Sequence, residues 1–302
     1  MTNLKLIEEK GRDDLAKVYI AKLEDGKPTI EFAESLQPPL SIDEKWVLMI
    51  SCLYGCPVQC LMCDAGWKYQ GKISKQAMLA QIDHMVSKRY PSGEIPAEKF
   101  KIQFARMGEP AFNLDVLEVL KELPTKYKMK RLIPCVSTIA PQDQNEFFTK
   151  LIEIKNHQYA NGNFQLQFSI HCTDEDLRNK LIPIDKWNFK QIAEYGEKFY
   201  KQGDRKITLN FAISKQFPVD PNTIAKYFNP DKFLIKITPL NPTNNVEKNA
   251  LDSALDTNNP NSINDLVQGF RNHNFEVIIS IGEVEENKIG SNCGQYVRVN
   301  GN

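Results

Sequence analysis

The run Trp46-Val-Leu-Met-Ile-Ser-Cys-Leu-Tyr-Gly-Cys56-Pro-Val-Gln-Cys60-Leu-Met-Cys63 decides how the rest of the chain is interpreted. Its first half is apolar and β-rich, which is typical of a buried strand. Its second half is a loop with three cysteines, separated by three and then by two residues. The run therefore predicts the first strand of a sheet, followed by a site at the strand's carboxyl end.

Three thiolates on one short loop can bind three irons of a 4Fe-4S cluster and leave the fourth iron open to a ligand from outside the protein. Zinc is one alternative, but it normally takes further ligands from a second pair, and no Cys-x-x-Cys or His-x-x-His follows downstream. A redox pair beside chance cysteines is another. The incomplete ligand set favours an iron–sulfur cluster bound by Cys56, Cys60 and Cys63.

Composition limits the class of protein. The 302 residues can bury one large core, and the 38 basic residues equal the 38 acidic ones, so no cationic surplus indicates a nucleic-acid partner. The amino terminus has no apolar signal core, and no run approaches the length of a membrane span. The other cysteines have no disulfide-framework spacing, so we expect a cytoplasmic protein without membrane contact.

The chain divides into a β-rich extension at 1–45 and a larger α/β domain at 46–302. In the extension, Lys17–Leu23 and Thr29–Ala33 alternate on either side of Asp25-Gly26, which is a strong hairpin signal. After it, Gln37-Pro-Pro39 excludes a helix.

From Trp46 onward, apolar β-rich runs alternate with helical periodicity, the pattern of a parallel sheet wrapped by helices. We expect an α/β fold, a partial (β/α)6 TIM-like barrel that is open on one side and preceded by the hairpin. The strands are expected near 46–52, 100–106, 131–137, 164–171, 206–213 and 233–239, with a final strand at 275–281. The helices are expected near 75–88, 114–122, 143–156, 189–202, 221–228 and 262–272.

In such barrels the chemistry gathers at the carboxyl ends of the strands. Polar or glycine-rich segments follow the expected strands at these places: Cys56 to Cys63, Met107-Gly-Glu-Pro110, Ser137-Thr138, Ser169-Ile-His171 and Pro239-Leu-Asn241. The tail cysteine, Cys293, lies in a further glycine-flanked loop after the final strand. Each of these residues also has a plain structural interpretation: Glu109 could cap a strand end, His171 could be a satisfied buried histidine, and Cys293 could be a small apolar residue.

Taken in order, these segments resemble the RlmN/Cfr-like branch of the radical SAM superfamily, which comprises RNA methyltransferases that act on an adenine ring carbon. The resemblance runs from about Lys17 to Tyr296, and Met62 stands where an aromatic residue usually precedes the last cluster cysteine. The matching motifs are Met107 to Pro110, Ser137-Thr138, Ser169 to His171, Asp174 to Arg178, Ile182 to Ile184, Pro239 to Pro242 and Asn292 to Tyr296.

The resemblance implies cofactors and residue roles. The open iron would bind S-adenosylmethionine, whose amino end Gly108 and Glu109 would hold, with Ser137, Ser169, His171 and Asn241 as further cofactor-binding residues. Cys293 would be methylated by one S-adenosylmethionine, and a 5′-deoxyadenosyl radical from a second would take a hydrogen from that methyl group. The resulting carbon radical would add to an sp² carbon of the substrate, with Glu31 as proton acceptor.

Four departures from the family pattern affect the expected activity. Met49 stands where the family has its second cysteine, and a thioether cannot release a protein–substrate link as a thiolate does. Cys52 could substitute for it, although residues three apart on a strand point to opposite faces, and it could equally be a core residue. The family's amino-terminal RNA-binding module, its basic carboxyl-terminal helix and the arginine of its last strand are missing.

We therefore expect a radical SAM methyltransferase that binds a 4Fe-4S cluster and S-adenosylmethionine and acts on an RNA adenine or on a smaller molecule or peptide. Its partners would be that substrate and an electron donor of the flavodoxin or ferredoxin type, and the chain is expected to be a monomer. One alternative is a radical SAM enzyme that does not methylate and uses Cys293 as hydrogen donor or anchor. The other is a non-catalytic binding protein that kept the fold.

Overall fold

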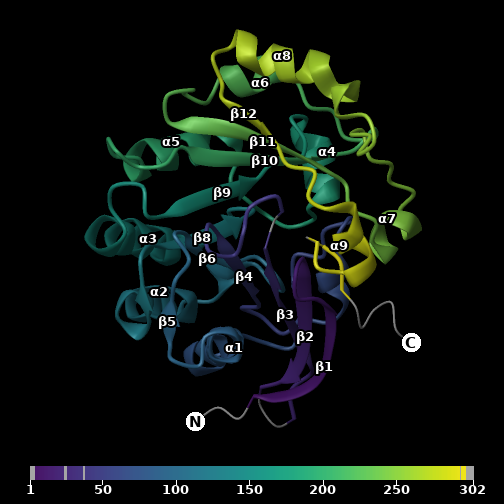
Figure 1. The fold of residues 1–302 in the computed structure, drawn as a ribbon. Coiled ribbons are helices and arrows are strands. Elements are labelled where there is room, and N and C mark those ends of the chain that lie inside the picture. The colour runs from purple at the N-terminus through teal and green to yellow at the C-terminus, as the bar shows by residue number, and fades with distance from the viewer. Residues whose placement is uncertain (1–3, 24–25, 37, 293, 297–302) are drawn as a thin grey trace.

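The structure, a computed structural model, describes residues 4–23, 26–36, 38–292 and 294–296. The described strands form one ten-stranded sheet in the order β1-β2-β3-β4-β6-β8-β9-β10-β11-β12, with a separate two-stranded sheet of β5 and β7. Strands and helices alternate from β4 onward (Figure 1). The predicted α/β class is confirmed.

Seven neighbouring strands of the large sheet are parallel, and the predicted strands correspond to them. The last of them, β12, is the expected final strand, and it pairs with β11 as a seventh parallel strand beside the six of the expected barrel. The parallel strands are β4 (Trp46–Ile50), β6 (Phe100–Phe104), β8 (Leu132–Thr138), β9 (Gln165–Ser169), β10 (Ile207–Ile213), β11 (Phe233–Pro239) and β12 (Val277–Ile279). The short pair is β5 (Glu94–Ile95) and β7 (Lys128–Met129).

The six expected helices are present and bury their apolar residues against one face of the sheet in the main core. They are α1 (Lys75–Arg89), α2 (Asp115–Lys126), α3 (Asn145–Gln158), α5 (Phe189–Phe199), α6 (Pro221–Ala225) and α8 (Asn264–Asn272). Three helices were not predicted: α4 (Glu175–Leu181), α7 (Asn244–Lys248) and α9 (Val284–Ile289). Each has five to seven residues, too few for a helical period to be recognised. No helix in the described ranges is long and apolar enough to cross a membrane.

The amino-terminal extension contains the predicted hairpin, formed by β2 (Ala16–Lys22) and β3 (Ile30–Ser35). A further strand, β1 (Lys5–Arg12), pairs antiparallel with β2 and was missed because its residues are mostly charged and exposed. β3 also pairs antiparallel with β4, so the extension and the parallel strands share one sheet (Figure 1). The division of the chain at residue 45 stays a prediction.

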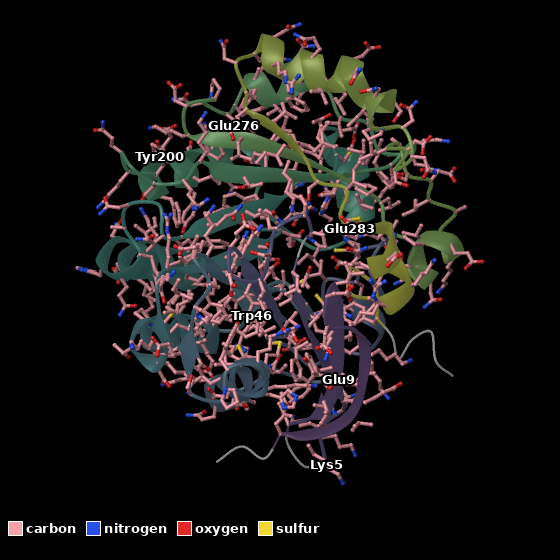
Figure 2. The ribbon with its side chains drawn as sticks, in the orientation of Figure 1. Lys5, Glu9, Trp46, Tyr200, Glu276 and Glu283 are labelled. Atoms are coloured by element: carbon pink, nitrogen blue, oxygen red, sulfur yellow. The ribbon has the colours of Figure 1, made fainter. Side chains whose placement is uncertain are left out.

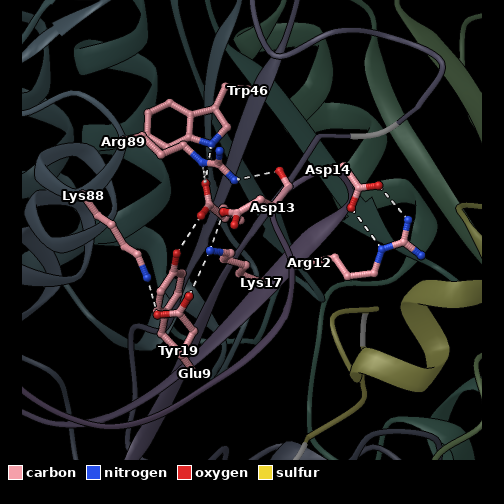
Figure 3. A network of polar contacts seen from close by, with 10 residues as sticks. Glu9, Arg12, Asp13, Asp14, Lys17, Tyr19, Trp46, Lys88 and Arg89 are labelled. Atoms are coloured by element: carbon pink, nitrogen blue, oxygen red, sulfur yellow. Dashed lines mark hydrogen bonds and ion pairs between the residues drawn. The ribbon is translucent and has the colours of Figure 1, made fainter.

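A buried carboxylate fastens this extension to the parallel sheet. Glu34, almost fully buried, accepts hydrogen bonds from the Tyr19 hydroxyl at 2.6 Å, from the Trp46 indole N–H at 2.7 Å and from the Arg89 guanidinium. Figure 3 shows Tyr19, Trp46 and Arg89 converging, and the Trp46 side chain (labelled in Figure 2) is fully buried. Since these partners lie on β2, β4 and α1, the hairpin that carries Glu31 has a fixed position relative to the sheet.

Candidate active site

The three cysteines of the predicted cluster lie in one loop directly after β4. Their thiols are half-buried, and the loop is attached to the end of β6, where the Met107 carbonyl accepts from the backbone N–H groups of Cys52 and Leu53 at 2.9 and 3.3 Å. Gly55 has a φ of 76°, and a Cβ there would lie 2.3 Å from the Lys68 carbonyl oxygen. The tight path of the loop therefore requires glycine at this position.

The surroundings of the thiols fit a 4Fe-4S cluster. Apolar side chains pack around Cys56 and Cys60, among them Val58, Ile139 and Phe112. Burial raises the pKa of the Cys60 thiol, and the neighbouring thiols Cys63 and Cys56 raise it further, so the three sulfurs share one environment. Among the described residues, no three His, Cys, Asp or Glu side chains converge on a single metal ion. A cluster differs from a single ion because each thiolate binds a different iron.

Residues far along the chain support the cysteine loop from outside. Asp64, next to the last cluster cysteine, accepts from the backbone N–H groups of Asn244 and Asn245 at 3.1 and 2.9 Å. The Asn245 side chain donates to the Cys63 carbonyl at 2.7 Å, and Thr243 donates to the Met62 carbonyl at 3.0 Å. These supports were not predicted, and the only signal for them is the run of Thr and Asn residues after Pro239-Leu-Asn-Pro242.

The segment after β6 brings a carboxylate close to the thiols. Gly108 has a φ of 99°, and a Cβ there would lie 2.5 Å from the Leu53 side chain, so the close approach of the two loops needs glycine. The buried Glu109 accepts from the Thr138 hydroxyl at 2.5 Å and from the backbone N–H groups of Ile139 and Ala111 at 2.9 and 3.1 Å. Burial raises the pKa of Glu109 to about 7, and this effect outweighs the three hydrogen bonds, each of which lowers the pKa.

The expected cofactor residues of the next strands lie at the carboxyl ends of β8, β9 and β11. Ser137 accepts a hydrogen bond from the Gln167 side chain at 3.3 Å, and the half-buried Ser169 and Asn241 lie at the ends of their strands. His171 is buried, and its Nδ1 accepts from the Ala212 backbone N–H at 2.9 Å. Burial lowers the pKa of His171 to about 3, so the imidazole is neutral at neutral pH.

An arginine that sequence reasoning missed joins Glu31 to the tail. Arg106 and Glu31 form a buried ion pair at 2.9 Å, with side chains 2% and 4% exposed. The same guanidinium donates to the carbonyls of Gly290, Ser291 and Asn292 at 2.8, 3.1 and 3.3 Å. No local signal in the sequence identifies this contact, because its partners are about 185 positions away.

The end of the described tail packs on Arg106 and on the cysteine loop. Arg106 lies 4.9 Å from the ring centroid of Tyr296, whose hydroxyl donates to the Arg106 carbonyl. The Gly294 carbonyl accepts from the Asp64 backbone N–H at 3.0 Å. Cys293, the predicted methyl acceptor, lies outside the described residues. The residues on either side of it connect to Glu31 and to the cluster loop, the two other parts of the predicted site.

Met49 and Cys52, the two candidates for the second cysteine position, lie in different surroundings. Met49 packs in a small cluster with residues of the hairpin and of α9. Cys52 is fully buried in the main core, and its thiol donates to the Met107 carbonyl at 3.5 Å. Cys52 is therefore packed as a core residue, and its substitution for the cysteine that Met49 replaces stays a prediction.

The fold is similar to that of a known radical SAM methyltransferase and, less closely, to that of a spore photoproduct lyase. A radical SAM methyltransferase from Sphaerobacter thermophilus superposes with a TM-score of 0.75 over 98% of this chain and 81% of that chain, at 18% identity. A spore photoproduct lyase mutant with dinucleoside spore photoproduct gives a TM-score of 0.50 over 77% of this chain and 75% of that chain, at 12% identity. No model of a known protein family matches the chain.

Sequence relatives indicate one branch of this class. The chain is 24% identical to the dual-specificity RNA methyltransferase RlmN of Wolinella succinogenes, over 80% of this chain and 68% of the relative. It is 23% identical to a probable RlmN of Streptomyces griseus, over 76% of this chain and 62% of that relative. It is 24% identical to a probable RlmN of Thermus thermophilus, over 71% of this chain and 57% of that relative. The predicted resemblance to RlmN-like radical SAM proteins is confirmed, and the chain spans between 57% and 68% of the length of these relatives.

Proposed function

We propose that the chain is a radical SAM methyltransferase of the RlmN-like type. Cys56, Cys60 and Cys63 would bind a 4Fe-4S cluster, and S-adenosylmethionine would bind beside it. When bound, these two groups supply an electron and a reactive 5′-deoxyadenosyl radical. The observation that carries the proposal is the loop of three half-buried cysteines directly after β4, which packs against the segment of Gly108 and the buried Glu109.

The residues around the thiols have separate tasks in this proposal. Gly108 allows the close approach of the two loops. Glu109, which is held by Thr138 and two backbone N–H groups, would accept a hydrogen bond from the cofactor's amino group. Ser137, Ser169, His171 and Asn241 would contact the rest of the cofactor from the strand ends. His171 can act only as a neutral group, because burial keeps it unprotonated.

Cys293 and Glu31 are the proposed catalytic residues. Cys293 would carry the methyl group to an sp² carbon, and Glu31 would take the proton that this carbon loses. The ion pair with Arg106 at 2.9 Å holds the buried Glu31 carboxylate beside the tail that carries Cys293. A polar methyl transfer is unsuited to a poorly nucleophilic ring carbon, which is why a radical route is needed.

The relatives' names indicate an RNA substrate. The balanced charge of this chain, however, offers few phosphate contacts. We therefore propose that the substrate is either an RNA or a smaller molecule or peptide, and we give the second class at least equal weight. A flavodoxin- or ferredoxin-type protein would supply the electron. A monomeric state and a cytoplasmic location stay predictions.

The first test measures iron and cofactor cleavage. Anaerobically reconstituted protein is expected to bind about four irons and to cleave S-adenosylmethionine when reduced. Cys56→Ala, Cys60→Ala and Cys63→Ala should each lose the cluster absorbance and the cleavage, whereas Cys135→Ala, a buried cysteine of β8, should keep both. Unchanged iron content in all three loop variants contradicts the cluster assignment.

A second candidate function is a radical SAM reaction without methylation. It is favoured by Met49, which replaces the family's second cysteine with a side chain that cannot be deprotonated. The mass of the peptide that contains Cys293 separates the two functions. A methylthioether on protein produced with S-adenosylmethionine supports methyl transfer, and an unmodified thiol under the same conditions supports the alternative.

A further inference from the structure

On three of the parallel strands, the face of the sheet opposite the helices is mostly polar. Along β6, β9 and β11, buried apolar residues alternate strictly with half-buried ones. The apolar set packs with the helices in the main core, so the alternate residues point to the opposite face. Parallel strands covered by helices on both faces are normally apolar throughout. On these three strands the second face, which we call the inner face, is half-buried and, apart from Leu234, polar.

Strand register brings three polar residues of the inner face into one row. Asn210 on β10 pairs with Ser169 on β9 and with Lys236 on β11. Neighbouring strands are about 4.8 Å apart, so the row spans about 10 Å. The Asn210 carbonyl accepts from the backbone N–H of His171 at 3.3 Å, which places the row just below the strand ends that carry the proposed cofactor residues.

Asn210 has an acceptor atom for which the described residues supply no donor. Its side chain is 8% exposed, and its Oδ1 is buried without a hydrogen-bond partner. Buried polar atoms in folded proteins are almost always paired with protein, water or ligand. A ligand that donates a hydrogen bond from a hydroxyl or amino group would satisfy this atom.

The inner face also carries positively charged side chains. Lys101 on β6 and Lys236 on β11 both belong to it, and Lys101 donates to Gln165 at 2.7 Å. The pKa of Lys45 is lowered to about 8, first by burial and then by Lys101 and Lys236 among other cations. Lysines from separate strands thus lie within electrostatic reach of one another, which favours an anion on this face.

We propose that Asn210 and Lys236, next to the proposed cofactor residue Ser169, recognise a small substrate that carries a carboxylate or phosphate beside a hydroxyl or amino group. Lys236 would pair with the anion, and the Asn210 Oδ1 would accept from the neighbouring donor. A small molecule fits better than RNA, because the row lies within the sheet face and Asn210 is nearly buried, whereas an RNA backbone needs exposed cations spread over a surface. The inference rests on the proposed function and names its substrate class.

The test measures ligand binding by reconstituted protein without turnover. Glycerol 3-phosphate and L-malate serve as probes, since each has a hydroxyl beside the anion and they separate phosphate from carboxylate. One of them is expected to raise the melting temperature of the wild type. Lys236→Met should weaken its binding about 10- to 100-fold and Asn210→Leu about tenfold, as loss of a charged and of a neutral hydrogen bond implies. Lys236→Arg should restore most of the affinity.

Lys128→Met is the matched control, because Lys128 is an exposed lysine of β7 that pairs with Glu94 at 2.8 Å. It should bind the probe as the wild type does. The proposal is overturned if neither probe stabilises the wild type, if Lys236→Met binds like Lys128→Met, or if the variants weaken S-adenosylmethionine and not the probe. If the wild type takes up no iron on reconstitution but still binds the probe, the proposed function is refuted and the proposed substrate site is supported.

Discussion

Arg106→Met tests whether the buried guanidinium holds the tail against the site. The substitution removes the ion pair with Glu31 and the hydrogen bonds to three tail carbonyls. Removing one partner of a buried ion pair costs about 3–5 kcal/mol of unfolding free energy, because the other charge stays buried. At about 2 °C per kcal/mol for a chain of this length, the melting temperature should fall by about 6–10 °C.

The assay is thermal and urea unfolding of the purified variants, with limited proteolysis of the tail after Gly290. Arg12→Met is the matched control, because Arg12 pairs with Asp14 and Glu285 at the exposed surface, where an ion pair contributes little. The double variant Arg106→Met/Glu31→Leu should be more stable than Arg106→Met alone, since both charges are then removed. Equal melting temperatures for Arg106→Met and Arg12→Met would refute the reasoning, as would a double variant less stable than the single one.

The Cys52→Ala variant should turn over normally, because the Cys52 thiol of the wild type lies in the core. Its intact-protein mass should show no covalent adduct, and an adduct that accumulates would make Cys52 the resolving residue. Glu109→Gln should keep its iron but bind S-adenosylmethionine about 10- to 100-fold more weakly in equilibrium titration, through loss of a charged hydrogen bond. The unfolded chain protonates His171 below about pH 6.5 and the folded chain only near pH 3, so stability should decrease as pH falls through this range and the decrease should be smaller in His171→Gln. Binding to tRNA or a ribosomal RNA hairpin should be weak and should collapse at moderate salt; tight, salt-resistant binding would restore RNA as the substrate.

The parallel strands could be predicted because their signal is local. Runs such as Phe233–Pro239 are β-rich and bounded by polar turns, and β11 begins and ends where expected. β1 escaped prediction because its strand state depends on pairing with β2, and its own residues are charged. The helix α7 escaped because its five residues are held by a hydrogen bond from Val246 to the Thr243 side chain and by contacts with the cysteine loop.

The residues of the candidate site also fall into those with a local signal in the sequence and those without one. The spacing of three cysteines and the Gly108-Glu109 pair can be recognised from adjacent residues, and the structure places them on touching loops. Arg106 carries no such signal, because its importance comes from carbonyl groups about 185 positions away. The polarity of the inner face has no local signal in the sequence either. Single lysines and asparagines within strands form a row only through the register of β9, β10 and β11. The roles of Cys293, Glu31 and the cofactor residues stay predictions.

The supports of the cysteine loop impose an order on its assembly. Asp64 is bonded to Asn244 and Asn245, 180 and 181 positions later, and to Gly294 beyond them. During translation the three thiols leave the ribosome long before these partners are made. A nascent chain that ends before residue 243 should therefore expose the loop to oxidation and to stray metal ions. We expect iron–sulfur delivery to follow release of the finished polypeptide, and a cell that makes this protein quickly to depend on a chaperone or a reducing thiol pool in that interval.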